Sequence, residues 1–277
     1  MLNGWRYYNH AWLPQCAPHE DIDASRINSD FWKQEGNGYS VLARWTSDWD
    51  CGFPTEWWYC IKDTPFDMEA LKQTRRYKVR RGERNFRVVR INPMEYIDAL
   101  FEVQVAAFSV YPSAYRPPNL TKENLMEDIR TRKNQITYGA FSKKNDALCG
   151  YVFIHHHGSY AELLVQKADP KAERDQVNAA LVKGVLDDLR DCFDGRFYLV
   201  DGERNINHQT NFQEYLIKYF GFRKAYCKLN IAYRPWVGLF IKMMYPFSSM
   251  LQNFDDLKYI HMLNALLKME RIARSFR

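Results

Sequence analysis

Residues 136–167, ITYGAFSKKNDALCGYVFIHHHGSYAELLVQK, contain three segments with the composition of β-strands. Segments 136–142, 147–156 and 160–167 are rich in β-branched and aromatic residues. A polar turn at 143–146 joins the first two segments, and a Gly-Ser turn at 158–159 joins the last two. Connections this short are typical of antiparallel neighbours. The stretch therefore predicts two successive antiparallel hairpins.

The flanking sequence predicts a mixed α+β fold. We expect a strand at 86–91, helices at 93–109 and 121–133, and then, after the hairpins, a helix at 176–192, a strand at 196–200, a helix at 211–220 and a strand at 224–233. This order lacks the regular alternation of a doubly wound fold. No GxGxxG or GxxxxGK[ST] motif supports nucleotide binding. We therefore expect a mostly antiparallel central sheet flanked by helices.

The two ends of the chain differ from this central part. The first 60 residues hold seven of the eight tryptophans, with strands expected at 39–45 and 57–62. Asp67 can cap a helix that begins near Met68 and stops at Gly82. Residues after 235 have a helical pattern. We expect an aromatic-rich N-terminal region at 1–85, a main domain at 86–235 and a helical tail at 236–277.

Composition narrows the class of protein. The chain has 277 residues, of which 46% are hydrophobic and 26% charged, as in ordinary globular proteins. Its six cysteines are scattered without a CxxC pair, which argues against a disulfide scaffold or a zinc ribbon. The N-terminus has no signal-peptide core, and the apolar stretch 236–247 is too short to span a bilayer. We expect a soluble, cytoplasmic protein.

Positive charge is concentrated in residues 72–90. This segment has nine cations and one acid, a net charge of +8, so the rest of the +6 chain sums to −2. Such a field attracts phosphates, nucleic acid or an anionic membrane surface. The alternative is a solvated helix face whose charges are balanced by local acids.

The order of elements resembles the GNAT acyltransferase fold, and in particular its FemAB-like branch, over roughly residues 40 to 235. The stretches WWYCIKDTPFDMEALKQTRRYKVRRG (57–82) and NFQEYLIKYFGF (211–222) are similar to the strand–helix opening and the penultimate helix of that branch. The chain is also similar to acyltransferase-like proteins of bacterial surface-polysaccharide clusters. The resemblance implies a GNAT-like domain at 86–235, a partial first GNAT-type half before it, and acyl transfer to an amine or hydroxyl of an amino sugar or lipid-linked glycan precursor.

The resemblance also implies acyl-coenzyme A as the donor. The family's phosphate-binding turn, [QR]-x-x-G-x-[GA], matches Arg174 to Ala179, where backbone N–H groups at a helix N-terminus would hold a diphosphate. The implied donor-binding residues are Leu164, Val165, Lys167, Lys171, Arg174, Gln176, Val177 and Asn178. Val177 stands at the glycine position, where a β-carbon crowds the approach of a phosphate. Two alternatives follow: an aminoacyl-tRNA donor contacting segment 72–90, and a catalytically degenerate GNAT scaffold that acts as a binding protein.

The same resemblance implies catalytic roles. Glu162, among apolar strand neighbours that would raise its pKa, is the expected base, and Tyr215 is the expected acid. Asn205, with Asp201 and His208, follows the strand 196–200 and is expected to touch substrate. The alternatives are an exposed strand glutamate, a packed core tyrosine, and turn or cap residues.

Two further features stay open at this stage. His155 and His157 share a strand face and could supply two metal ligands, but no third ligand has a recognisable spacing, so no metal is expected. The stretch RPWVGLFIKMMYPFSSML (234–251) is apolar with few cations. It is expected either to lie on a membrane surface, where a lipid-linked acceptor would be found, or to pack on the domain or on a homodimer partner.

Overall fold

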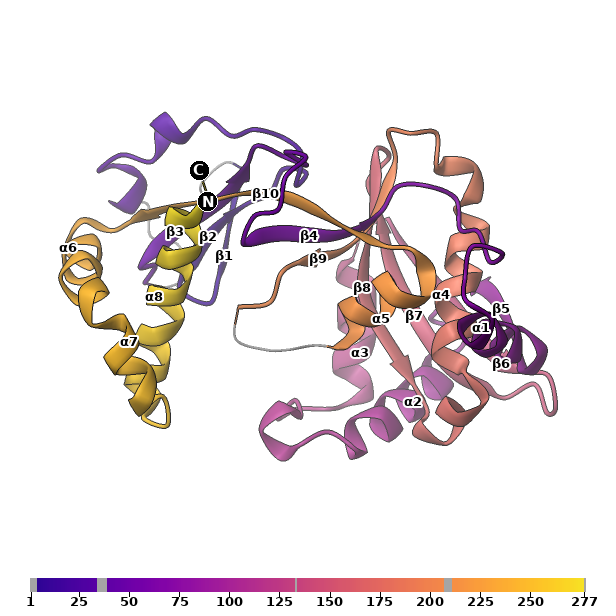
Figure 1. Cartoon of the computed structure of the whole chain (residues 1–277). Helices are drawn as coiled ribbons and strands as arrows, with labels where there is room; N and C mark the ends of the chain where they lie inside the picture. The colour runs from indigo at the N-terminus through magenta and orange to yellow at the C-terminus, as the bar shows by residue number, and fades with distance from the viewer. Residues whose placement is uncertain (1–3, 34–38, 133, 207–210, 277) are drawn as a thin grey trace. The chain divides into compact units, whose positions relative to one another are not determined.

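The computed structural model describes residues 4–33, 39–132, 134–206 and 211–276 (Figure 1). The chain forms two compact units. The terminal unit consists of residues 1–59, 203–210 and 224–277, and the central unit of residues 60–202 and 211–223. The three-part division expected from the sequence, with limits at 85 and 235, does not coincide with these units. The basic helix packs within the central unit, and the strand ending at residue 233 pairs with an N-terminal strand.

The central unit is built on five strands in the order β5-β6-β7-β8-β9. They are β5 (Phe86–Ile91), β6 (Gln135–Ser142), β7 (Leu148–His156), β8 (Tyr160–Ala168) and β9 (Tyr198–Glu203). The first four are consecutive antiparallel neighbours, whereas β9 runs parallel to β8. The two predicted hairpins, β6–β7 and β7–β8, are therefore confirmed, and the sheet is mixed and mostly antiparallel.

Helices cover both faces of this sheet. Helices α2 (Ile97–Ser109) and α3 (Lys122–Thr131) form one core cluster with Tyr151 and Phe153 of β7. Helix α4 (Val177–Asp188) packs on the opposite face, where Gly150 leaves room for the side chain of Val177. Helix α1 (Gln73–Asn85) packs against α4 and α5 (Asn211–Phe220).

Helix α1 differs from its expected limits. It begins at Gln73, because the side chain of Asp67 accepts the N–H of Glu69 in a turn rather than capping a helix. It also continues past Gly82 to Asn85. A β-carbon at residue 82 would lie 2.7 Å from the carbonyl oxygen of Gln176. The glycine therefore allows two helices to approach closely and does not end one of them.

Three other helices are shorter than expected. Helix α3 begins at Lys122, after its capping residue Thr121, and ends at Thr131 instead of 133. Helix α2 begins at Ile97 instead of residue 93, since the side chain of Asn92 accepts the N–H of Met94 in a turn. Helix α4 ends at Asp188, and a separate 3-10 turn, Arg190–Cys192, follows it. In contrast, β4 (Trp57–Lys62), β5 and α5 match their expected limits to the residue.

The terminal unit contains two strands that the sequence analysis missed. β1 (Trp5–Tyr8) and β2 (Ala11–Pro14) form an antiparallel hairpin, and β2 runs parallel to β3 (Leu42–Ser47). β3 pairs with β10 (Arg223–Tyr233). Asn9 and His10 form the hairpin turn with positive φ values of 44° and 62°, without the glycine that usually marks such a turn. Trp12, Phe31 and Trp32 are buried together, so these aromatic residues fill a core.

Helices α6 (Pro235–Met244), α7 (Ser248–Leu251) and α8 (Lys258–Ser275) complete the terminal unit. Val237, Ile241 and Leu267 join α6 to α8 in a buried cluster. The same segment also has ten large hydrophobic side chains that are at least 41% exposed, namely Trp236, Leu239, Phe240, Met243, Phe247, Met250, Phe254, Leu257, Tyr259 and Met262. Among the described helices, none has the length and hydrophobicity needed to cross a membrane.

Candidate active site

Strands β8 and β9 separate soon after they pair. Residues 160–162 of β8 face residues 198–200 of β9, and no later register pair joins the two strands in the part of the chain that the structure describes. At the same place β8 has a bulge: Leu163 pairs with Ile154, Val165 pairs with Phe153, and Leu164 stands between them without a register partner on β7. Bulges re-aim backbone groups and are common beside active sites. The edge of β8 after Glu162 can therefore accept an extended ligand.

Glu162 lies at the last register pair of these strands. Its neighbour across β7 is His155, and His157 Nε2 is 3.9 Å from Glu162 Oε2. The Glu162 side chain is 39% exposed. The apolar surroundings expected from the sequence are therefore wrong, because strand alternation places imidazole rings, and not its leucine neighbours, beside this carboxylate.

Asp201 follows Val200, the residue of β9 that faces Glu162. Burial raises the pKa of Asp201 to about 7, and a hydrogen bond from Gln213 of α5 opposes that rise. A carboxyl group with this pKa exchanges its proton near neutral pH, as a general base must. From the sequence, Asp201 is expected only to touch substrate. In the sequence, Asp201 directly follows the apolar run 197–200, and this position could have predicted that its carboxyl group is shielded from water.

Tyr215 lies on α5, the helix that also supplies Gln213. Its ring contacts Phe212, Tyr219 and Phe220. Burial raises the pKa of the Tyr215 hydroxyl, so it keeps its proton at neutral pH and could serve as an acid.

Asn205 is exposed and belongs to the terminal unit, so its place relative to the other catalytic candidates stays a prediction. His208 lies outside the described residues.

The turn before α4 differs from the expected phosphate cradle. A 3-10 turn, Pro170–Asp175, leads into Gln176, which has a left-handed backbone with φ of 68°. Val177 is fully buried, with its side chain toward Gly150. The β-carbon of Val177 is therefore part of the core, and the left-handed position that glycine favours is occupied by Gln176.

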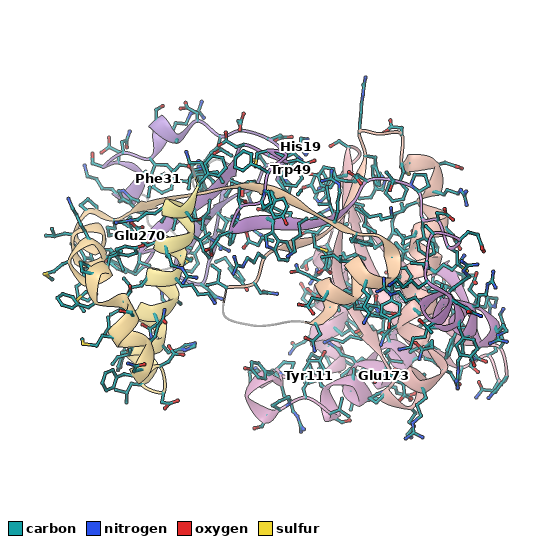
Figure 2. All side chains as sticks on the ribbon, in the orientation of Figure 1. His19, Phe31, Trp49, Tyr111, Glu173 and Glu270 are labelled. Atoms are coloured by element: carbon teal, nitrogen blue, oxygen red, sulfur yellow. The ribbon has the colours of Figure 1, made fainter. Side chains whose placement is uncertain are left out.

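The other residues expected to bind the donor are dispersed. Lys167 Nζ lies 4.0 Å from the ring centre of Phe108 in the last turn of α2, and 4.7 Å from that of Tyr111, which follows the helix. Tyr111 is labelled in Figure 2. Asn178 accepts a hydrogen bond from Gln166, and Leu164 and Val165 pack against the α2 cluster. Lys171 and Arg174 are exposed on the 3-10 turn, and Glu173, which is also exposed, directly precedes Arg174 in the sequence. These side chains do not form one common cradle.

Helix α1 also covers a flank of the first turn of α4. The β-carbon that Gly82 lacks would lie 2.9 Å from the backbone nitrogen of Ala180. Arg81 forms an ion pair with Asp175, and Asn85 donates to the Asp175 carbonyl. The start of α4 is thus already in contact with protein on this side.

Much of the positive segment 72–90 is balanced within the chain. Five cations form ion pairs with acids outside the segment: Arg76 and Arg80 with Glu69, Arg81 with Asp175, Arg87 with Asp146, and Arg90 with Asp188. Lys78 and Arg84 lie over the rings of Tyr219 and Tyr77. These contacts favour a helix face with local counter-charges, and leave a smaller positive field than the sequence alone indicates.

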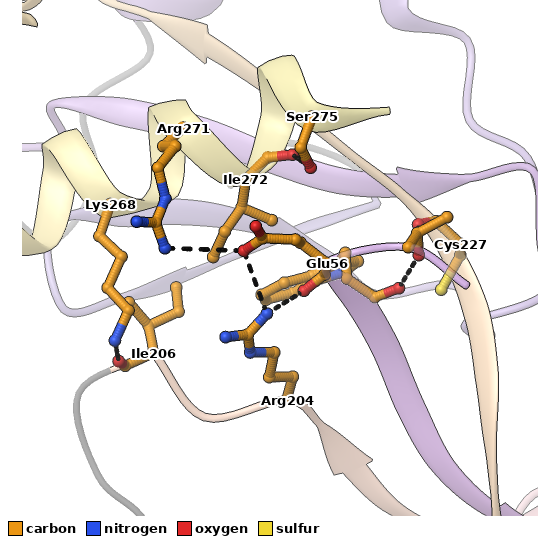
Figure 3. Close-up of polar contacts among 10 residues, drawn as sticks. Glu56, Arg204, Ile206, Cys227, Lys268, Arg271, Ile272 and Ser275 are labelled. Atoms are coloured by element: carbon orange, nitrogen blue, oxygen red, sulfur yellow. Dashed lines mark hydrogen bonds and ion pairs between the residues drawn. The ribbon is translucent and has the colours of Figure 1, made fainter. Parts of the chain in front are cut away.

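The terminal unit has a separate polar pocket of about 540 Å³. It is lined by Pro54, Thr55, Glu56, Trp58, Arg204, Lys224, Tyr226 and Arg271. Figure 3 shows Glu56 between Arg204 and Arg271, at 3.5 and 3.6 Å, while Lys268 Nζ donates to the carbonyl of Ile206. With three cations and one acid in its lining, this pocket favours an anionic group.

No protein-family model matches the chain, and no curated protein matches it. Solved structures similar to it include the C-terminal domain of a putative lysylphosphatidylglycerol synthetase from Agrobacterium fabrum (13% identity, 85% of this chain and 82% of that chain, TM-score 0.49). FemX is 12% identical over 61% of this chain and 59% of that chain, with a TM-score of 0.45.

The PaiA N-acetyltransferase from Thermoplasma acidophilum, solved in complex with coenzyme A, is 18% identical over 39% of this chain and 73% of that chain, with a TM-score of 0.32. The chain spans only 13% of one similar structure, a fungal multidomain protein, and 61% of an Escherichia coli N-acetyltransferase. Because these TM-scores are below 0.5 and the identities below 20%, they assign neither a family nor an activity.

Proposed function

We propose that this chain is a transferase that moves an acyl or aminoacyl group from a carrier to an amine or hydroxyl acceptor. The observation that carries the proposal is the coincidence of three features at one place in the central unit. The bulge at Leu164 lies two residues after the last pair between β8 and β9, and the half-buried Asp201, whose carboxyl group has a pKa raised by desolvation, follows the same pair. Acyl transfer needs a place for the donor and a group that takes the proton of the nucleophile, and these features offer both.

In this proposal the donor arm lies along the open edge of β8. Leu164 has no register partner across the bulge, and in this proposal its backbone N–H donates to the carbonyl oxygen of the acyl group, where negative charge develops in the transition state. Asp201 takes the proton of the attacking amine or hydroxyl, because its raised pKa makes it an effective base near pH 7. Tyr215, which stays protonated, returns a proton to the leaving group.

Glu162 was the base expected from the sequence, and it remains the second candidate for that role. Its exposure and its imidazole neighbours favour Asp201 instead. Comparing Asp201→Asn with Glu162→Gln in a single-turnover transfer assay separates the two. We expect Asp201→Asn to lower the chemical rate by about 100-fold or more. Full transfer by Asp201→Asn, with loss of transfer by Glu162→Gln, would return the role to Glu162.

Acyl-coenzyme A is the first candidate donor, because the order of elements and the turn before α4 resemble those of the GNAT fold. The second candidate is aminoacyl-tRNA. It is supported by the contact of α1 with the first turn of α4, and by the acids Glu173 and Asp175 beside that turn, which disfavour a diphosphate there. The acceptor proposed from the sequence is an amino sugar or a lipid-linked glycan precursor.

Calorimetric titration with acetyl-coenzyme A tests the donor. Micromolar binding that is lost in Arg174→Ala and kept in Arg130→Ala, an exposed arginine of α3, would support coenzyme A. No binding of coenzyme A, together with tRNA binding that weakens steeply as salt rises, would support the second donor. Absence of both would favour a scaffold that binds without catalysis and would contradict the proposed transfer.

A further inference from the structure

The β7–β8 hairpin gathers three metal-ligating side chains. His155 lies at the end of β7, His157 directly follows that strand, and Glu162 faces His155 across the hairpin. One ligand atom of each residue lies within 4.8 Å of the others. The two imidazole rings are 4.0 Å apart, and His157 Nε2 is 3.9 Å from Glu162 Oε2. We call these three residues the hairpin cluster.

The backbone holds the hairpin cluster in place. The N–H of His157 donates to the carbonyl oxygen of Tyr160 at 2.9 Å, which closes the turn. The Tyr160 ring stacks on the His157 ring, with centres 4.3 Å apart and planes at 8°, and Tyr160 in turn stacks on Tyr198 of β9. The side chains of His157 and Glu162 are 28% and 39% exposed, so an ion can reach them from solvent.

These separations suit a small divalent ion. Two ligand atoms that each lie about 2.0–2.1 Å from a tetrahedral zinc ion are about 3.3 Å apart. His157 and Glu162 are 3.9 Å apart, and all three ligand atoms lie within 4.8 Å of one another, so the side chains must rotate inward to reach that value around an ion. Two imidazoles and one carboxylate select zinc or a similar transition metal over magnesium and calcium, which prefer oxygen ligands.

We propose that His155, His157 and Glu162 bind a zinc-class divalent cation, with the fourth coordination position open to water. The sequence pattern alone indicates His155 and His157 as ligands. Glu162 could not be identified in this way, because only the strand register of the hairpin brings it beside the two histidines. The proposal does not rest on the proposed transferase activity. An ion at this place would lie beside the last pair of β8 and β9, and thus next to the open edge of β8.

Titration of the untagged, chelator-treated full chain with zinc chloride tests the site. We expect one ion per chain, with affinity reduced at least about 10-fold in His155→Ala and in Glu162→Gln. His156→Ala is the matched control, because His156 lies in the same hairpin but stacks on Phe197 and accepts the N–H of Gly158. Its zinc affinity should equal that of the wild type.

Cobalt binding gives a second readout on the unaltered protein. Tetrahedral cobalt absorbs visible light far more strongly than the aqua ion, so stoichiometric Co²⁺ should produce an intense band that zinc then displaces. Absence of stoichiometric zinc binding to the wild type, or equal losses in His156→Ala and His155→Ala, would overturn the proposal. Magnesium chloride at the same concentration should leave the heat and the spectrum unchanged, and equal binding of magnesium would also contradict a zinc-class site.

Discussion

The buried carboxyl group of Asp201 links stability to pH at a single residue. Its ordinary pKa of 3.8 rises to about 7 in the fold, so the folded chain keeps a proton that the unfolded chain has already released. Stability therefore falls as pH rises from about 4 to 7, and the full penalty applies above 7. Asp201→Asn removes this penalty. It should raise the free energy of unfolding by up to about 4 kcal/mol at pH 8, since about 3 pKa units at about 1.4 kcal/mol each are removed, with little change near pH 4.

Urea unfolding of wild type and Asp201→Asn at both pH values measures this effect. An equal shift at pH 4 and pH 8 would contradict the pKa assigned to Asp201, since an uncharged packing effect does not depend on pH. The same variant is expected to lose transfer activity. Gain of stability together with loss of rate is what a buried general base should show.

Gly82 provides a prediction at a helix contact. An added β-carbon would lie 2.7 Å from the Gln176 oxygen and 2.9 Å from the Ala180 nitrogen, both backbone atoms that cannot rotate away. Alanine is the better helix former by about 1 kcal/mol, but we expect the cost of overpacking to exceed that gain. We expect Gly82→Ala to lower the free energy of unfolding by about 2 kcal/mol.

The matched control is Gly238→Ala in α6. There the nearest atom to the added carbon is the Tyr233 β-carbon, at 3.3 Å, and stability should change little or rise. Thermal unfolding of both variants compares them directly. Equal stability of Gly82→Ala and wild type would show that α1 is not packed this closely on α4.

At the scale of elements, local sequence carried most of the information about the central sheet. The strands β5–β8 and helix α5 follow from composition and short turns, because each is built from neighbouring residues. The position of Gly82, the third ligand of the hairpin cluster and the bulge at Leu164 could not be read in this way. Each depends on which residue of another helix or strand lies next to it, and such tertiary contacts cannot be deduced from the local sequence.

Lys167 illustrates the same limit and gives a prediction. The resemblance placed it at the donor diphosphate, whereas its ammonium group lies against Phe108 and Tyr111 and joins β8 to the end of α2. A cation over two aromatic rings stabilises the fold by about 1 kcal/mol. Lys167→Met should therefore lower the free energy of unfolding by about that amount, while Lys171→Met, at an exposed lysine, should leave it unchanged. Equal effects of the two substitutions in urea unfolding would contradict this role.

At the scale of the whole molecule, the many exposed apolar side chains of α6–α8 predict an anionic lipid surface as the partner of this segment. Residues 235–277 contain six Lys or Arg and three Asp or Glu, so a positive charge accompanies the ten exposed apolar side chains. Leu239 and Met243 lie one turn apart on α6 and are 71% and 60% exposed. Burying both in a membrane interface contributes about 2 kcal/mol or more.

Co-sedimentation with vesicles measures this contribution. Replacing Leu239 and Met243 together with serine should weaken binding to phosphatidylglycerol vesicles about 10-fold or more, whereas Val110→Ser, at a 63% exposed site of the central unit, should not. Neutral phosphatidylcholine vesicles should bind the wild type less tightly, because they lack the charge that attracts the basic tail. If sedimentation equilibrium instead detects a dimer that the same double substitution dissociates, and vesicles bind neither form, the face belongs to a second copy of this chain. That result is incompatible with the membrane prediction, since one apolar face cannot be buried against both partners at once.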